Sequence, residues 1–156
     1  DLSRGDILCQ RDAYLCSANG IEVTLGFTKR LGAGLLGGEG FILQRLSGDG
    51  WAFVHAGGFV IERELGPGES LRVDTGCIAA FEETVDYDIR MVKGFKSMLF
   101  GGEGMFLAYL KGPGNDWLQT MPFSRLARRI GGAIGSGQGE TRRGGLSMLG
   151  DMLGGD

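Results

Sequence analysis

The motif "VDTG", Val73 to Gly76, has the residue types of an aspartic-protease site. In such sites two carboxylates share one proton, because both cannot ionise side by side. Asp74 would supply one carboxylate, and a hydrolase would need the second from Asp74 of a partner copy. An Asx-type turn explains the same residues without catalysis. We predict a chain without catalytic residues, and hydrolysis by Asp74 across a dimer is the alternative.

Two other patterns could indicate a cofactor or a metal. Gly32, Gly34 and Gly37 fit the G-x-G-x-x-G spacing of dinucleotide sites, but they run directly into the strand-like "FILQRL" where such a site needs a helix. His55 is the only histidine, which removes the ordinary histidine-containing metal clusters. The acidic residues of segment 82–88 lack the spacing of a calcium loop, and we expect them to form a solvated strand edge. We therefore predict no cofactor and no metal.

The segment "GGEG" occurs twice in the chain. Its carboxylate would repel an anion, so the segment is a poor phosphate site despite its glycines. Glycine permits unusual backbone angles, and the glutamate can accept hydrogen bonds from amide groups that a sharp bend leaves exposed. We predict structural turns at Gly37, Gly38, Glu39 and Gly40, and at Gly101, Gly102, Glu103 and Gly104.

The two GGEG copies lie 64 residues apart, from Gly37 to Gly101, and the same offset aligns much longer segments. "LLGGEGFILQRLSGDG" aligns with "LFGGEGMFLAYLKGPG" without a gap, and "GIEVTLGF" aligns with "TVDYDIRM". At this offset Gln10 takes the place of Asp74, so one chain does not supply both carboxylates of a protease pair. A register of this length indicates two copies of one structural module.

The repeated segments have the patterns of strands. "IEVTL" and "VDYDI" alternate apolar and polar residues, and "FILQRL", "WAFVHA" and "FVIEREL" are short, apolar and bounded by glycine. In "FSRLARRI", Ser124 can cap a short helix with Leu126 and Ile130 on one face. The sequence predicts an all-β fold: two repeated modules forming a β-sandwich or double-stranded β-helix-like domain, with one short C-terminal helix.

The domain organisation follows from the repeat. We predict a repeated β domain over residues 1–130, with modules at about 3–66 and 67–130. Residues 131–156 are rich in glycine and are predicted to form a flexible tail. The chain begins without methionine, and we interpret it as a fragment or a processed chain that lacks an upstream module.

Composition excludes some function classes. Lys and Arg total 16 against 19 Asp and Glu, and the cations are scattered, whereas nucleic-acid binders present cations at phosphate spacing. Cys9, Cys16 and Cys77 form no C-x-x-C pair. We predict buried, reduced thiols and a reducing compartment. No apolar run is long enough to suggest a membrane span.

The ordered motifs "KRLGAGLLGGEGFILQRLSGDG", "VDTGCIAAFEETVDYDI", "LFGGEG" and "WLQTMPFSRLARRI" resemble the mitochondrial-biogenesis family first described as altered inheritance of mitochondria. The resemblance covers roughly residues 3–130 and is specific. It implies a fold like that of the tryptophan RNA-binding attenuator protein, assembly into symmetric oligomers and a further β module upstream. The glycine-rich tail is similar to that of bacterial members, and the family provides no catalytic residues.

The segments before each GGEG, "FTKRLGAGLL" and "MVKGFKSMLF", combine apolar residues with lysine or arginine. Exposed apolar patches rimmed by cations mark subunit contacts or docking at an anionic membrane surface. A short helix packed on its own sheet is the structural alternative. The candidate interface residues are Leu31, Leu35, Leu36, Phe95, Leu99 and Phe100.

These observations favour a non-enzymatic, oligomeric β scaffold or interaction module. The expected partners are further copies of the chain and a membrane surface or another protein, with no nucleic acid and no small-molecule substrate. The expected location is the bacterial cytoplasm, with membrane association if the candidate interface docks on lipid. The alternatives are the Asp74 hydrolase and RNA binding by fold analogy.

Overall fold

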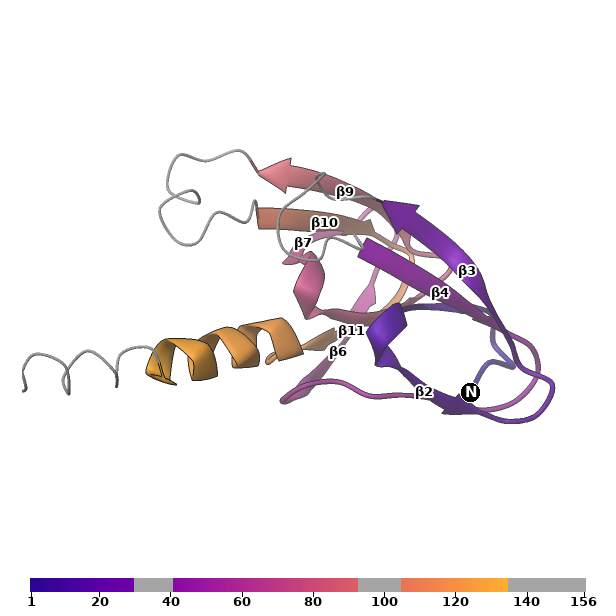
Figure 1. Cartoon of the computed structure of the whole chain (residues 1–156). Helices are drawn as coiled ribbons and strands as arrows, with labels where there is room; N and C mark the ends of the chain where they lie inside the picture. Colours follow the sequence, from indigo (N-terminus) through magenta and orange to yellow (C-terminus); the bar gives the residue numbers. More distant parts are fainter. Residues whose placement is uncertain (30–40, 93–104, 135–156) are drawn as a thin grey trace, which may run out of the picture. The chain divides into compact units, whose positions relative to one another are not determined.

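A computed structural model describes residues 1–29, 41–92 and 105–134 of the chain. The chain divides into two compact units, Asp1–Pro122 and Phe123–Asp156. The described part of the first unit contains eleven strands and two short 3₁₀ helices, and the second unit begins with a helix over residues 123–134 (Figure 1). The predicted all-β class with one C-terminal helix is confirmed.

The first repeat contains, in order, β1 (Ile7–Gln10), the 3₁₀ helix η1 (Arg11–Ala13), β2 (Tyr14–Ser17), β3 (Glu22–Lys29), β4 (Phe41–Ser47), β5 (Ala52–Val54) and β6 (Val60–Leu65). The second contains β7 (Ser70–Asp74), the 3₁₀ helix η2 (Thr75–Cys77), β8 (Ile78–Glu82), β9 (Asp86–Val92), β10 (Met105–Lys111) and β11 (Gly114–Gln119). The element order from β1 to β5 therefore recurs from β7 to β11.

Strand pairing confirms the predicted repeat in detail. The pair Ile7 and Leu46 between β1 and β4 recurs 64 residues later as Leu71 and Leu110 between β7 and β10. A register shift between β2 and β5 recurs at the same offset between β8 and β11. Two modules with the same strands, the same pairs and the same irregularity are copies of one structure.

The two repeats interlock through one sheet. The six-stranded sheet has the order β3-β4-β1-β8-β11-β6, and the other two sheets are β7-β10-β9 and β2-β5. Strand β1 pairs with β4 of its own repeat and with β8 of the second repeat. Strand β6 of the first repeat pairs with β11. Strands of the first repeat therefore flank both sides of the β8–β11 pair.

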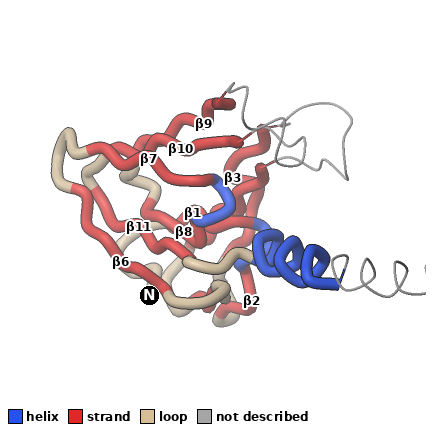
Figure 2. The backbone as a smooth tube through the Cα atoms, turned by 90° about the vertical axis from the view of Figure 1, so that its left-hand side faces the viewer, coloured by secondary structure: helices blue, strands red, loops and turns tan. Residues whose placement is uncertain are grey.

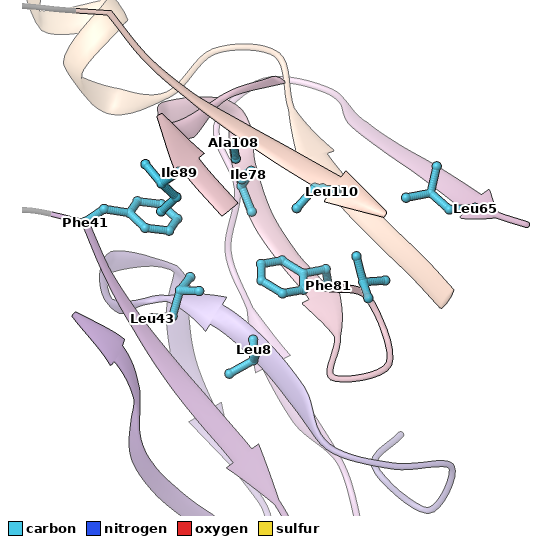
Figure 3. Packing of buried hydrophobic residues seen from close by; sticks show 10 residues of the cluster. Leu8, Phe41, Leu43, Leu65, Ile78, Phe81, Ile89, Ala108 and Leu110 are labelled. Atoms are coloured by element: carbon cyan, nitrogen blue, oxygen red, sulfur yellow. The ribbon is translucent and has the colours of Figure 1, made fainter. Parts of the chain in front are cut away.

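The main core lies between the six-stranded sheet and the β7-β10-β9 sheet, which form the two layers visible in Figure 2. Strand β8 shows why: its segment "IAAF" is apolar and buried throughout, as expected of a central strand with both faces covered. The buried residues of this core are Leu8, Phe41, Leu43, Leu65, Ile78, Phe81, Val85, Ile89, Ala108 and Leu110, most of which are labelled in Figure 3.

A second, smaller core lies on the other face of β1 and β4. It contains Leu2, Cys9, Ala13, Leu46 and Ala80, with Tyr14 and Ala52 of the β2-β5 sheet packed against it. Most of its residues come from the first repeat, Ala80 on β8 comes from the second, and the β2-β5 sheet is its outer wall.

The repeats differ at their last element. The segment equivalent to β6, at the offset of 64 residues, falls in the helix over 123–134. This helix includes residues 131–134, so the expectation that the tail begins at Gly131 is wrong for these four residues. Each glycine costs a helix only about 1 kcal/mol relative to alanine, and Ala133 and Ile134 extend the apolar pattern beyond the glycine pair.

Gly57 marks a close approach of two backbones. A Cβ placed on Gly57 would collide with the backbone carbonyl oxygen of Met121, and Gly57 N donates to Gln119 Oε1 at 2.9 Å. We expect Gly57→Ala to lower the free energy of unfolding by about 1–3 kcal/mol, because the backbone must move to fit the methyl group. Urea unfolding monitored by tryptophan fluorescence measures the loss.

Gly66→Ala is the matched control. The nearest atom to its Cβ would be Glu69 Oε2 at 3.8 Å, an ordinary contact, and we expect a change within about 0.5 kcal/mol. Equal losses in the two variants would contradict the close approach at Gly57.

Candidate interaction surface

The predicted turn and interface residues lie outside the described residues, in segments 30–40 and 93–104. The turns predicted at Gly37, Gly38, Glu39, Gly40, Gly101, Gly102, Glu103 and Gly104 and the interface predicted at Leu31, Leu35, Leu36, Phe95, Leu99 and Phe100 therefore stay predictions. The candidate features below all lie within the described residues.

Asp74 ends β7 and caps the 3₁₀ helix η2. Its Oδ1 accepts a hydrogen bond from Gly76 N at 2.9 Å, which is the geometry of an Asx-type turn. Gln10, its equivalent in the first repeat, donates from Nε2 to the carbonyl oxygen of Thr75 at 2.6 Å. Both repeats thus use this position for a polar contact that orders a turn.

A cavity of about 490 Å³ has five acidic residues in its wall, Asp1, Asp6, Glu62, Glu82 and Glu83. Glu82 accepts from Asn115 N and Nδ2 at 2.8 and 3.0 Å. Its carboxylate thereby links β8 to β11, so the expected solvated role of segment 82–88 is wrong for Glu82.

Asp6 and Glu83 in this wall also make structural contacts. Arg45 Nη1 on β4 lies 2.5 Å from Glu83 Oε1 and 3.6 Å from Asp6 Oδ2. Ser47 Oγ donates to the same Asp6 oxygen at 2.7 Å. No group of three or more metal-ligating side chains occurs within the described residues. These contacts therefore link inner strands of the six-stranded sheet, joining β4 to residues beside β1 and β8, and β8 to β11.

Asp116 on β11 is the most unusual polar residue of the fold. Its side chain is fully buried, and neither carboxylate oxygen has a hydrogen-bond partner. Burial raises the pKa of the Asp116 carboxyl; nearby Arg63 lowers it and Glu69 raises it. The first repeat has Ala52 at the equivalent position, so the module does not need this carboxylate to fold.

A more extended feature is the β2–β5 ribbon, the two-stranded sheet of Tyr14–Ser17 and Ala52–Val54. Its inner side chains pack on the smaller core, while its other side chains are open to solvent. Leu15 is 62% exposed and Phe53 is 53% exposed. Trp51, next to β5, is also exposed. The ribbon thus presents large apolar side chains on its outer side.

The second repeat covers the same positions. Ala79, the equivalent of Leu15, is 1% exposed, and Ala80, the equivalent of Cys16, is buried. Two strands of the first repeat flank the second-repeat pair: β1 pairs with the outer edge of β8, and β6 pairs with the outer edge of β11. Across residues 1–29, 41–92 and 105–134, no strand takes these two places beside β2 and β5. The ribbon therefore has the same strand pair as β8–β11 but lacks the two flanking strands.

Charge distinguishes this ribbon from the other sheet edges. Unpaired strand edges in soluble proteins are usually protected by charged residues, which prevent unwanted pairing. The edge strands β6 ("VIEREL"), β7 ("SLRVD") and β9 ("DYDIRMV") all carry charges, whereas β2 ("YLCS") and β5 ("AFV") carry none. The ribbon therefore has the chemistry of an interface.

The cysteines partly differ from expectation. Cys9 is buried, and burial raises the pKa of its thiol to about 11. Cys77 is half-buried, and Cys16 on the ribbon is exposed, so the prediction of three buried thiols is wrong for Cys16. Its apolar neighbours in the sequence line the ribbon surface instead of a core.

The sequence predicted an interface in the glycine-rich loops and did not indicate the exposed apolar surface of the ribbon. A signal was present: "YLCS" and "AFV" are uncharged, whereas the other strands except β1, "ILCQ", contain charges. The repeat alone could not reveal it, because equivalent segments have equivalent patterns whether or not a neighbouring strand covers them.

These features define an all-β domain built from a duplicated, interlocked module with one open apolar ribbon. The sequence profile of the Mitochondrial biogenesis AIM24 family matches residues 1–121, and the chain belongs to this family. No curated protein matches the chain. No helix in the described part is both long and apolar enough to cross a lipid bilayer.

A solved structure supports the fold. The chain is similar to the crystal structure of protein SPYM3_0169 from Streptococcus pyogenes, with a TM-score of 0.64 and 20% sequence identity. The alignment covers 80% of this chain and 54% of that protein, so the chain spans about half of its length. At this identity the similarity concerns the fold alone.

The buried carboxyl of Asp116 should make the stability of the folded protein depend on pH. The raised pKa means that the folded state binds the Asp116 proton more tightly than the unfolded state. The contribution of Asp116 to stability is therefore greatest below the ordinary aspartate pKa of about 3.9 and falls as pH rises through the folded-state value. Asp116→Asn removes this charge, and we expect the variant to gain about 1–3 kcal/mol over the wild type at neutral pH.

Urea unfolding of both proteins at several pH values measures this difference. It should shrink as the pH is lowered, because the wild-type carboxyl becomes neutral. Asp49→Asn, at an exposed turn position, is the control and should change stability little at any pH. A difference between wild type and Asp116→Asn that stays constant with pH would contradict the buried, unpaired carboxylate.

Proposed function

We propose that this chain is a non-enzymatic interaction module that assembles with further copies of itself through the β2–β5 ribbon. The observation that carries the proposal is the contrast between the repeats: the first exposes Leu15 and Phe53 on strands whose equivalents are flanked on both sides in the second. Burial of such side chains supplies most of the favourable free energy of protein association.

A second copy of the chain fits this surface because the ribbon is uncharged. When two copies meet around a twofold axis, both contribute the same patch, so a charge near the axis would face its own kind. Tyr14–Ser17 and Ala52–Val54 contain no charge and therefore avoid this repulsion. Each apolar residue that is buried in such a contact contributes twice.

The alternative functions gain no comparable support from the described residues. The Asp74 carboxylate orders the turn at Gly76, a contact that explains its presence without hydrolysis. For RNA binding, Arg90 lies 4.6 Å from the ring centre of Tyr109 and its Nε lies 2.7 Å from Asp88 Oδ2. The carboxylate partly offsets the positive charge that phosphate binding requires.

Analytical ultracentrifugation over a range of protein concentrations tests the proposal. We expect the wild type to associate, and the double variant Leu15→Ser with Phe53→Ser to weaken association by at least about tenfold, because two apolar contacts are lost from each copy. Both side chains are exposed in the single chain, so the variant should unfold at nearly the same urea concentration as the wild type.

Leu25→Ser is the matched control, because Leu25 is an exposed leucine on β3, outside the ribbon. It should leave association unchanged. A wild type that stays monomeric at every concentration, or a double variant that associates as strongly as the wild type, would overturn the proposal.

A further inference from the structure

The helix over residues 123–134 has an apolar stripe along its length. Phe123, Leu126, Ile130 and Ile134 are spaced by three or four residues, which places them on one side of a helix with 3.6 residues per turn. All four side chains are exposed, Phe123 at 81% and Ile134 at 65%. Ala127 and Ala133 fall at the borders of this stripe and widen it.

The opposite side of the same helix is basic. Arg125, Arg128 and Arg129 fall on the side away from the apolar stripe, together with the small residues Ser124, Gly131 and Gly132. Residues 123–134 contain no acidic residue, although the whole chain has a net charge of -3. The positive charge is thus concentrated beside an exposed apolar stripe.

An exposed apolar stripe and arginines on one short helix are typical of a helix that binds at a membrane surface. A helix with a strong apolar face and arginines beside it lies in the plane of an anionic membrane surface, with its apolar side chains at the boundary of headgroups and acyl chains. Its arginines then contact lipid phosphates, with about 1 kcal/mol per cation near an anionic surface. A helix of 12 residues is about 18 Å long, too short to cross a bilayer of about 30 Å.

We propose that the helix over residues 123–134 docks the protein on an anionic lipid surface. Phe123, Leu126, Ile130 and Ile134 enter the interface, and the three arginines bind the phosphates around them. The proposal is independent of self-association, because its residues lie in the unit Phe123–Asp156 and the ribbon lies in the unit Asp1–Pro122.

Cosedimentation of the full chain with lipid vesicles tests this inference. We expect binding to vesicles of phosphatidylcholine mixed with phosphatidylglycerol, and at least about tenfold weaker binding to phosphatidylcholine alone. Raising the salt concentration should weaken binding to the mixed vesicles, since salt screens the arginines. The double variant Ile130→Ala with Ile134→Ala should bind at least about tenfold more weakly, because it loses apolar area.

The alanine variant keeps the helix, since alanine has the highest helix propensity, and circular dichroism checks this. Arg128→Gln with Arg129→Gln is the second variant and should weaken binding to the mixed vesicles alone. Leu25→Ser and Arg4→Gln are the matched controls on exposed residues of the other unit and should bind like the wild type. Absence of vesicle binding, equal binding to both vesicle types, or wild-type binding by both helix variants would overturn the inference.

Discussion

The structure depends on the pairing of β1 with two partners at once. On one side β1 pairs with β4 of its own repeat, and on the other it pairs with β8 of the second repeat. The backbone hydrogen bonds of β8 are thereby satisfied on both sides, which permits the fully buried segment "IAAF" at the centre of the sheet. Neither repeat could bury this strand alone, so duplication is a condition of the main core.

The exposed strands of the two repeats differ in charge. At the C-terminal side the chain replaces the equivalent of β6 with a helix, and β7 and β9 carry charges along their edges. At the other side the β2–β5 ribbon is apolar and open. This difference between the two repeats is the reason for proposing an interface at the β2–β5 ribbon.

Much of the fold could be predicted, because the repeat and the alternation of apolar and polar residues can both be recognised in the sequence alone. The 64-residue offset and the all-β class needed only the alignment of "FILQRLSGDG" with "MFLAYLKGPG". The interaction surface could not be predicted in the same way. Whether Leu15 is covered depends on which strand lies beside β2, and β1 joins β8 from 70 residues away along the chain.

The same reasoning explains the other differences. Asp116 reads as a surface residue within "GNDW", yet it faces the interior because β6 and β8 lie on either side of β11. Gly131 and Gly132 suggest the end of a helix, but the helix continues through them to residue 134. In each case contacts or spacing beyond the local residue types decided the outcome.

Hydrogen exchange measured by mass spectrometry, on protein dilute enough to be monomeric, tests the interlocking of the repeats most directly. Amides of β8, Ile78–Glu82, should exchange at least about tenfold more slowly than those of β2, Tyr14–Ser17, because β8 is paired on both sides and β2 on one. Equal exchange rates in these two equivalent strands would contradict the account.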